Sequence, residues 1–397
     1  MRRLLLLLMI PGAAFALDPT RLISQYGHAV WTVQDGFLPG APTEMVQTTD
    51  GYLWIGTRGG LVRFDGVRFV PFTPPPGEKL RSNRILTLGA GRDGSLWIGT
   101  RSGLHRYKDG RLKYFDDAPG WAMSIVEDDA GKIWFTRSSL SDDKGPLCEV
   151  QGDRALCHGR ADGVPISNAR QLSRDAQGNL WTVSDDTLMR WKDGVARTWM
   201  PPGISDQGRV AAIDVLQSVV VGPDGAIWVG AMQPSRGLGL LHLKDDRLQP
   251  FVTPGLDGRK LAMTLTFVDR DRALWIGTQD EGVYRLHDGK VDRFRARDGL
   301  SGDTVQFFYE DREGTVWVLT TRGIEAFRDL AVLSVTSREG LSADLANAVL
   351  ARRDGSVWIN AWHSLDVMKD GKITSLNSKN GLPGEEVLTQ DRSRFNG

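Results

Sequence analysis

Short apolar runs, too brief for long helices, recur along the whole chain and are separated by glycine-containing turns. Residues 45–72 show the pattern best. An apolar run ends at a turn over Asp50-Gly51, and residues 52–57 pack Leu, Trp and Ile around it. Residues 61–64 then alternate apolar and polar, and Asp65-Gly66 is a strong signal for a two-residue hairpin turn into a last strand. The pattern predicts four short antiparallel strands joined by tight turns.

A tryptophan marks the second strand of each copy, and successive copies follow at steps of 37 to 47 residues. A recurring spacing near forty residues is typical of a repeat architecture. Because one four-stranded sheet cannot bury both of its faces, the sheets are expected to stack radially as the blades of a β-propeller, an all-β fold. The repeated tryptophans then fill the space between neighbouring blades: Trp54, Trp97, Trp134, Trp181, Trp228, Trp275, Trp317 and Trp358.

The order of the runs predicts how the ring closes. The tryptophans from Trp54 to Trp317 indicate a seven-bladed propeller over residues 17–330. Residues 29–33 resemble the fourth strands of other repeats, so we expect this lone strand to complete the last blade. Residues 331–397 open with a second strand of this type, over residues 331–341, and are expected to start a second, truncated propeller, because residues 386–391 begin a repeat that the C-terminus interrupts. A single eight-bladed ring is the alternative.

The N-terminus and the cysteines indicate export. Residues 1–16 combine two arginines, an apolar core and an Ala-Phe-Ala cleavage site, which is the pattern of a cleavable signal peptide. We therefore expect a periplasmic protein. If Gly152-Asp153 forms a two-residue turn, Cys148 and Cys157 lie opposite each other within disulfide reach. A disulfide is favoured over two free, buried thiols.

Composition and motifs narrow the function mainly by exclusion. The 397 residues are 41% hydrophobic, and 49 Lys and Arg balance 49 Asp and Glu. The chain can bury a large core, and no excess of charge indicates a nucleic-acid partner. The six histidines are scattered without metal-ligand spacing, and no nucleophile motif is present. We expect no metal, no cofactor and no catalytic residue.

The tight turns fall on one face of the predicted propeller, and the loops of variable length fall on the other, where binding sites usually lie. The longest of these connections are residues 137–146, 232–239 and 201–210. On this loop face, four arginines follow the tryptophan strand at one repeat position: Arg58, Arg101, Arg137 and Arg322. A ring of four guanidiniums could bind carboxylates or sulfates bidentately. The alternative is that each arginine braces a neighbouring blade.

Other residues break the repeat pattern on this face and are further candidates for ligand recognition: Gln233, Gln279, Asp280, Trp362 and His363. The aromatic residues outside the core position could stack on sugar rings, although packing is the alternative: Trp121, Trp199 and Trp362.

Residues 50–64 and 93–107 share the sequence Asp-Gly-x-Leu-Trp-Ile-Gly-Thr-x-x-Gly-Leu-x-Arg-Phe/Tyr. This repeat resembles the two-component regulator propeller, and residues 30–39 resemble the segment that opens such sensors. The resemblance implies the periplasmic half of a receptor whose transmembrane helix leads to a histidine kinase or a diguanylate cyclase. It also implies a small-molecule ligand such as an oligosaccharide, a homodimer in the full receptor, and membrane attachment only through a missing C-terminal part.

The predicted function is therefore a periplasmic ligand-binding sensor module, the N-terminal fragment of a signalling receptor, with no enzymatic activity of its own. Two alternatives belong to other classes. One is a secreted lyase or hydrolase, because propellers such as streptogramin lyase carry catalysis. The other is a scaffold that binds a protein through the loop face.

Overall fold

The computed structural model describes residues 17–138, 144–203, 216–330, 335–361, 363–369 and 372–382. The predicted signal peptide and the interrupted repeat at residues 386–391 lie outside these ranges. The described residues fall into two compact units, one containing Gly27–Asp329 and the other containing Ser24–Tyr26 and the residues from Leu330 onward. Their helices are 3-10 segments of three residues, none long and apolar enough to cross a membrane. These segments are η1 (Ile23–Gln25), η2 (Val33–Asp35), η3 (Arg160–Asp162), η4 (Pro234–Arg236), η5 (Gly258–Lys260) and η6 (Ala296–Asp298).

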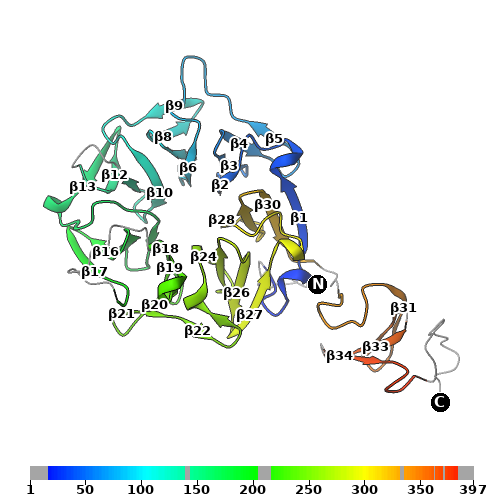
Figure 1. Cartoon of the computed structure of the whole chain (residues 1–397). Helices are drawn as coiled ribbons and strands as arrows, with labels where there is room; N and C mark the ends of the chain where they lie inside the picture. The colour runs from blue at the N-terminus through cyan, green and yellow to red at the C-terminus, as the bar shows by residue number, and fades with distance from the viewer. Residues whose placement is uncertain are drawn as a thin grey trace, which may run out of the picture. The chain divides into compact units, whose positions relative to one another are not determined.

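The first unit contains seven described four-stranded antiparallel sheets, which are arranged in a ring (Figure 1). The first strand of each sheet is innermost and the last lies at the rim. We number these sheets as blades 1 to 7 in chain order. Blade 1 consists of β2 (Pro42–Gln47), β3 (Leu53–Thr57), β4 (Leu61–Phe64) and β5 (Phe69–Pro71).

The next five blades follow the same order. Blade 2 is β6 (Ile85–Ala90), β7 (Leu96–Thr100), β8 (Gly103–Lys108) and β9 (Arg111–Tyr114). Blade 3 is β10 (Trp121–Glu127), β11 (Ile133–Ser138), β12 (Leu147–Gln151) and β13 (Arg154–His158). Blade 4 is β14 (Leu172–Arg174), β15 (Leu180–Val183), β16 (Leu188–Lys192) and β17 (Val195–Trp199). Blade 5 is β18 (Leu216–Val221), β19 (Ile227–Gln233), β20 (Leu238–Lys244) and β21 (Arg247–Pro250). Blade 6 is β24 (Met263–Val268), β25 (Leu274–Thr278), β26 (Val283–His287) and β27 (Lys290–Phe294), preceded by the small ribbon β22 (Val252–Thr253) and β23 (Leu256–Asp257).

Blade 7 combines the two ends of this unit. It contains β28 (Val305–Glu310), β29 (Val316–Thr320) and β30 (Gly323–Arg328), and its outer strand is β1 (Gly27–Thr32). Gly27 pairs with Arg328 and Thr32 with Gly323 in antiparallel register. The prediction that a lone N-terminal strand completes the last blade is confirmed.

The second unit contains one described sheet, formed by β31 (Ala346–Ala351), β32 (Val357–Ala361), β33 (Ser364–Lys369) and β34 (Lys372–Leu376). The strand expected over residues 331–341 is not seen, because residues 331–334 lie outside the described ranges and residues 335–341 form a turn. The blade count of the complete protein and the identity of this unit as the start of a second propeller stay predictions.

The repeated tryptophans fill the space between blades. Six of the eight are buried, with at most 8% of the side chain exposed, whereas Trp228 and Trp358 are half-buried. Trp54 of blade 1 packs against Ile85 and Leu88 of blade 2, and Trp317 of blade 7 packs against Met45 of blade 1. Such contacts join each blade to the next, so the tryptophans connect the sheets into one core.

A hydrogen bond fixes most of these indoles. In four blades the indole N–H donates to an aspartate six residues earlier: Trp134 to Asp128 (3.0 Å), Trp181 to Asp175 (2.8 Å), Trp275 to Asp269 (2.7 Å) and Trp317 to Asp311 (2.8 Å). Thr48 accepts from Trp54 in blade 1. Blade 2 has Gly91 at this position, and the indole N–H of Trp97 is buried without a hydrogen-bond partner.

The substitution Gly91→Asp is expected to raise stability by about 1 kcal/mol, because it supplies the missing acceptor. A Cβ atom at Gly91 would lie 3.3 Å from Trp97 Nε1, and the close neighbour that must move is the Asp93 side chain. Urea denaturation measures the change. The control is Gly222→Asp, which should bring little gain because the facing Trp228 is half-buried and already reaches water. A loss of stability in Gly91→Asp would contradict the expectation.

One turn differs from its prediction. Phe64 pairs with Phe69, so residues 65–68 form a four-residue loop and not a two-residue hairpin at Asp65-Gly66. The Asp65 carboxylate accepts the backbone N–H groups of Val67 (2.9 Å) and Arg68 (2.7 Å) and thereby closes the wider turn. Paired residues with positive φ, as a two-residue type I′ turn requires, occur at Asp109-Gly110, Asp193-Gly194 and Asp288-Gly289.

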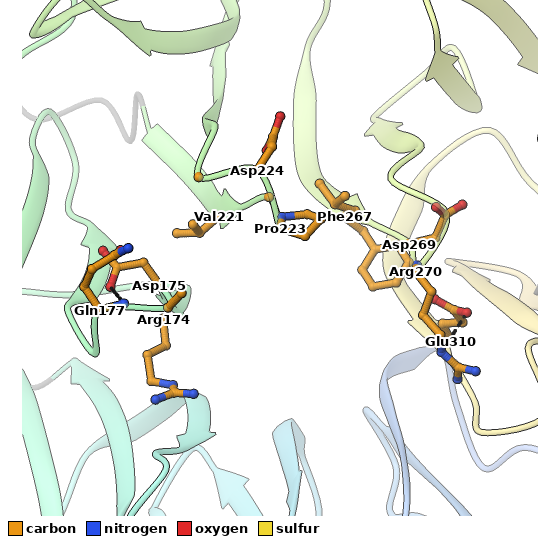
Figure 2. Close-up of a pocket in the computed structure, with 14 residues that line it drawn as sticks. Arg174, Asp175, Gln177, Val221, Pro223, Asp224, Phe267, Asp269, Arg270 and Glu310 are labelled. Carbon is orange, nitrogen blue, oxygen red and sulfur yellow. Dashed lines mark hydrogen bonds and ion pairs between the residues drawn. The ribbon is translucent and has the colours of Figure 1, made fainter.

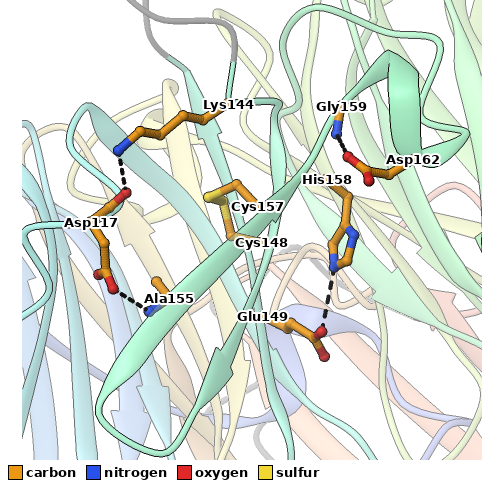
Figure 3. Close-up of a disulfide and its surroundings, with 9 residues drawn as sticks. All are labelled: Asp117, Lys144, Cys148, Glu149, Ala155, Cys157, His158, Gly159 and Asp162. Atoms are coloured by element: carbon orange, nitrogen blue, oxygen red, sulfur yellow. Dashed lines mark hydrogen bonds and ion pairs between the residues drawn. A yellow bond between two sulfur atoms is a disulfide. The ribbon is translucent and has the colours of Figure 1, made fainter.

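Cys148 and Cys157 are joined by a disulfide across β12 and β13 (Figure 3). The two residues lie directly opposite each other in the register, with Cα atoms 3.9 Å apart. The Asp117 carboxylate accepts the backbone N–H of Ala155 at 3.1 Å and connects this hairpin to the segment before blade 3.

Candidate functional site

The structure separates the four arginines predicted to form a ring. Arg58, Arg101 and Arg322 are exposed, but only 2% of Arg137 is exposed. The reason is strand length. β3 and β7 end one residue before Arg58 and Arg101, whereas β11 continues to Ser138 and holds Arg137 within the sheet, opposite Ala122. Arg137 therefore does not belong to the solvent-facing group.

A further arginine, missed in the sequence, joins Arg58 and Arg101. Arg84 directly precedes β6, and because Ile85 pairs with Thr100, Arg84 comes beside Arg101. A Cβ atom at Gly56 would lie 2.6 Å from the Ile85 side chain, so the end of β3 packs against the start of β6. Arg58, which follows β3, therefore also lies near Arg84, which precedes β6. Loss of hydration and the positive charges of Arg101 and Arg58 lower the pKa of Arg84.

This arginine cluster, defined as Arg58, Arg84 and Arg101, has no counter-charge from the part of the chain that the structure describes. The Nε atom of Arg84 is buried without a hydrogen-bond partner. Arg101 lies over the indole ring of Trp121, 4.4 Å from its centroid, and Trp121 is 44% exposed. Three guanidiniums and an exposed aromatic ring can bind an anion such as a carboxylate or a sulfate.

The other predicted residues lie elsewhere. Gln233 and Gln279 belong to blades 5 and 6, and the Gln279 amide contacts Met232 Sδ at 2.9 Å; the neighbouring Asp280 is exposed. Arg322 is in blade 7, and His363 is exposed in the second unit. Trp362 lies outside the described residues. Trp199 is buried, stacked on Trp181 and bonded to Asp246, so packing explains it.

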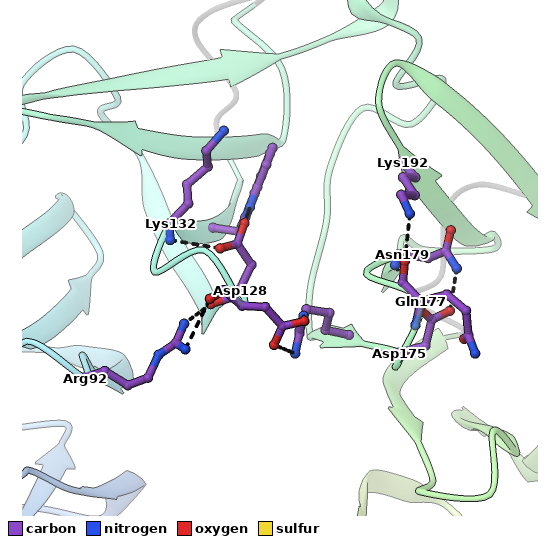
Figure 4. A network of polar contacts seen from close by, with 10 residues as sticks. Arg92, Asp128, Lys132, Asp175, Gln177, Asn179 and Lys192 are labelled. Atoms are coloured by element: carbon purple, nitrogen blue, oxygen red, sulfur yellow. Dashed lines mark hydrogen bonds and ion pairs between the residues drawn. The ribbon is translucent and has the colours of Figure 1, made fainter.

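The tight-turn face carries a repeated contact that the sequence analysis missed. The residue five positions before the core tryptophan is arginine in three blades: Arg92, Arg270 and Arg312. Each guanidinium donates to two successive backbone carbonyls in the first turn of the next blade. Arg92, for example, reaches the carbonyls of Asp128 and Asp129, the latter at 3.3 Å (Figure 4). Arg270 and Arg312 make the same pair of contacts. We call these contacts arginine braces.

A cavity of about 550 Å³ opens on the same face between blades 4 to 7 (Figure 2). Half of its lining residues are polar or charged, including Asp175, Asp224, Asp269 and Glu310, and Phe267 forms an aromatic wall. Burial raises the pKa of both Asp269 and Glu310. In the described ranges, no group of three His, Cys, Asp or Glu residues is arranged to hold a metal ion.

The sequence matches no protein-family model and no curated protein. Solved structures, however, are similar in fold. The extracellular domain of a B. thetaiotaomicron protein assigned as the hybrid two-component system BT3049 is 16% identical with a TM-score of 0.65, over 88% of this chain and 49% of that chain. The extracellular domain of the one-component system BT4673 from the same organism is 17% identical with a TM-score of 0.61, over 93% of this chain and 50% of that chain. The chain is a β-propeller.

Enzymes share this β-propeller likeness. Virginiamycin B lyase from Staphylococcus aureus, in a structure with quinupristin, is 14% identical with a TM-score of 0.59, over 77% of this chain and 100% of that chain. At such identities the likeness shows the fold and not the activity. The chain spans about half the length of the two extracellular domains.

Proposed function

We propose that the chain is a periplasmic ligand-binding sensor module of a signalling receptor, and that its ligand is a small acidic molecule such as an oligosaccharide carrying carboxylate or sulfate groups. The observation that carries this proposal is the arginine cluster. Three guanidiniums converge from two blades without a carboxylate partner in the described structure. The fold of receptor extracellular domains supports the sensor role, because such domains share this architecture.

Physical reasoning favours an anionic ligand. Like charges at close range repel each other, so three adjacent arginines without counter-ions cost stability that a bound anion would recover. A carboxylate or sulfate can accept two parallel hydrogen bonds from one guanidinium. The Arg101 guanidinium lies over one face of the exposed Trp121 ring. The apolar face of a sugar could stack on the opposite face of this ring.

The test is ligand binding by calorimetry and thermal shift, with uronic-acid and sulfated disaccharides compared with neutral disaccharides. A bound ligand should raise Tm without being consumed. Arg84→Gln should weaken binding of the acidic sugars about tenfold to a hundredfold, because it removes charged hydrogen bonds. The matched control is Arg322→Gln, which removes an exposed arginine of blade 7 and should leave the affinity unchanged. Equal binding of neutral and acidic sugars would overturn the anion preference.

A lyase is the second candidate, because a virginiamycin B lyase has the same fold over its full length. It predicts formation of a product when the chain is incubated with a cyclic ester or a polysaccharide. Mass spectrometry of the incubated ligand distinguishes the two functions, since a sensor returns its ligand intact. Accumulation of product that is lost on substitution of channel-lining residues would replace the sensor assignment.

A further inference from the structure

The cavity on the tight-turn face lies where two arginine braces are missing. Arg92, Arg270 and Arg312 occupy one repeat position at the junctions of blades 2 and 3, 6 and 7, and 7 and 1. At the junction of blades 3 and 4 the charges are exchanged, because Asp129 holds this position and pairs with Arg174. The junction of blades 1 and 2 has Thr49 at this position, and two adjacent junctions, of blades 4 and 5 and of blades 5 and 6, have Ala176 and Pro223. The cavity lies at these two junctions.

The backbone of the two open junctions keeps the acceptors that a guanidinium would use. By the repeat register, an arginine in place of Ala176 would reach the carbonyls of Gly222 and Pro223. One in place of Pro223 would reach those of Asp269 and Arg270. All of these residues line the cavity. Among the described residues, the carbonyls of Pro223 and Arg270 accept no hydrogen bond from the protein, whereas the equivalent carbonyl of Asp129 accepts from Arg92.

The surrounding side chains are adapted to the missing brace. In a braced junction, the backbone N–H of the arginine donates to a side chain at the end of the next inner strand, as Arg270 does to Glu310 at 2.8 Å. At the junction of blades 5 and 6, that side chain is Val268, which cannot accept, and Pro223 has no N–H to donate. Among the described residues of this junction, the loss of the arginine therefore leaves only the carbonyls without a partner.

The charge of the cavity favours a cation. Arg174 and Arg270 both line it, but their charges are offset by Asp129 and Glu310. Among the described residues, the carboxylate of Asp224 accepts one local hydrogen bond, from the backbone N–H of Ala226 at 3.0 Å, and its side chain is exposed. We propose that this cavity binds a guanidinium group supplied by a ligand, with the turn carbonyl of Pro223 or that of Arg270 as an acceptor and Asp224 as the counter-charge. Phe267 would contact the aliphatic part of the ligand.

Two probes separate the sources of the guanidinium. Agmatine represents a free small molecule, and a blocked Gly-Arg-Gly peptide represents an arginine side chain of a partner protein. The same peptide with citrulline has the same shape without the charge. Titration followed by NMR of the full chain should show saturable binding of at least one guanidinium probe at or below about 10 mM, and none of the citrulline peptide. Binding of agmatine identifies a free ligand, and binding of the peptide alone identifies a partner's arginine.

Variants of the chain test the location. The double variant Ala176→Arg/Pro223→Arg supplies two internal braces and should abolish probe binding. The matched control is Thr49→Arg, which fills the same repeat position at the open junction of blades 1 and 2, outside the cavity, and should leave binding unchanged.

Asp224→Asn should weaken binding about threefold to tenfold without affecting the fold. Binding that survives the double variant, or that the citrulline peptide shares, would overturn the proposal. Arg84→Gln should not alter it, so the site is tested separately from the arginine cluster.

Discussion

Replacement of Trp275 by alanine is expected to lower the free energy of unfolding by about 3–5 kcal/mol. The side chain is fully buried and contacts Phe308 and Phe327, with ring centroids 6.0 and 6.4 Å apart. Its removal opens a void between blades 6 and 7. It also removes the hydrogen bond that the indole N–H donates to Asp269, and this leaves a buried carboxyl without that donor. Urea denaturation followed by far-UV circular dichroism measures the loss.

The control for this prediction is Trp121→Ala. Trp121 is 44% exposed, and its truncation should cost less than about 1.5 kcal/mol, because little area returns to water. Similar losses in the two variants would show that the tryptophans do not hold the blades together.

The second large effect concerns Glu44. This half-buried carboxyl of β2 borders a mainly apolar cavity of about 270 Å³, with Leu88, Ile125 and Tyr309 among its neighbours. Burial raises the pKa of Glu44 to about 8, and the nearby Thr87 hydroxyl and Leu88 backbone amide offset only part of the rise. Below pH 4.5 the carboxyl is neutral in both the folded and the unfolded chain. As the pH rises to about 8, folding increasingly requires protonation, so this group lowers stability.

The substitution Glu44→Gln removes that dependence. The variant should be about as stable as the natural chain near pH 4.5 and about 2–4 kcal/mol more stable at pH 9, after allowance for partial exposure. The measurement is the free energy of unfolding of both proteins at pH 5, 7 and 9. Asp116→Asn changes an exposed carboxyl and serves as the control, in which no difference should grow with pH. A constant difference in Glu44→Gln would show that this group does not titrate in the expected window.

The blades and their packing could be predicted because they repeat. A tryptophan near every fortieth residue fixes the second strand, and the turns on either side fix its neighbours. The register of the Gly152-Asp153 turn was sufficient to place Cys148 opposite Cys157. Asp65 shows the limit of such reasoning, since its carboxylate supports a wider loop with the same two residues.

The candidate sites were harder to predict because they depend on departures from the repeat. Arg84 precedes an inner strand and has no counterpart at the same place in other blades, so only the pairing of Ile85 with Thr100 reveals its neighbours. Arg137 shares the repeat position of Arg58, but a longer strand buries it. The braces did have a signal in the sequence, namely an arginine five residues before Trp97, Trp275 and Trp317, and Arg353 stands at the same distance before Trp358. Their meaning required the contacts across blades.

The pairing of β1 with β30 also imposes an order on assembly. The acceptor edge of β30 cannot be covered by its own chain until residue 328 has been synthesised, and residues 27–32 must wait unpaired while the intervening sheets form. During that interval a newly made chain presents one free strand and one free sheet edge that are complementary. At high local concentration, two such chains can exchange these strands and form an interlocked pair. Dilute conditions should therefore favour single rings over exchanged ones.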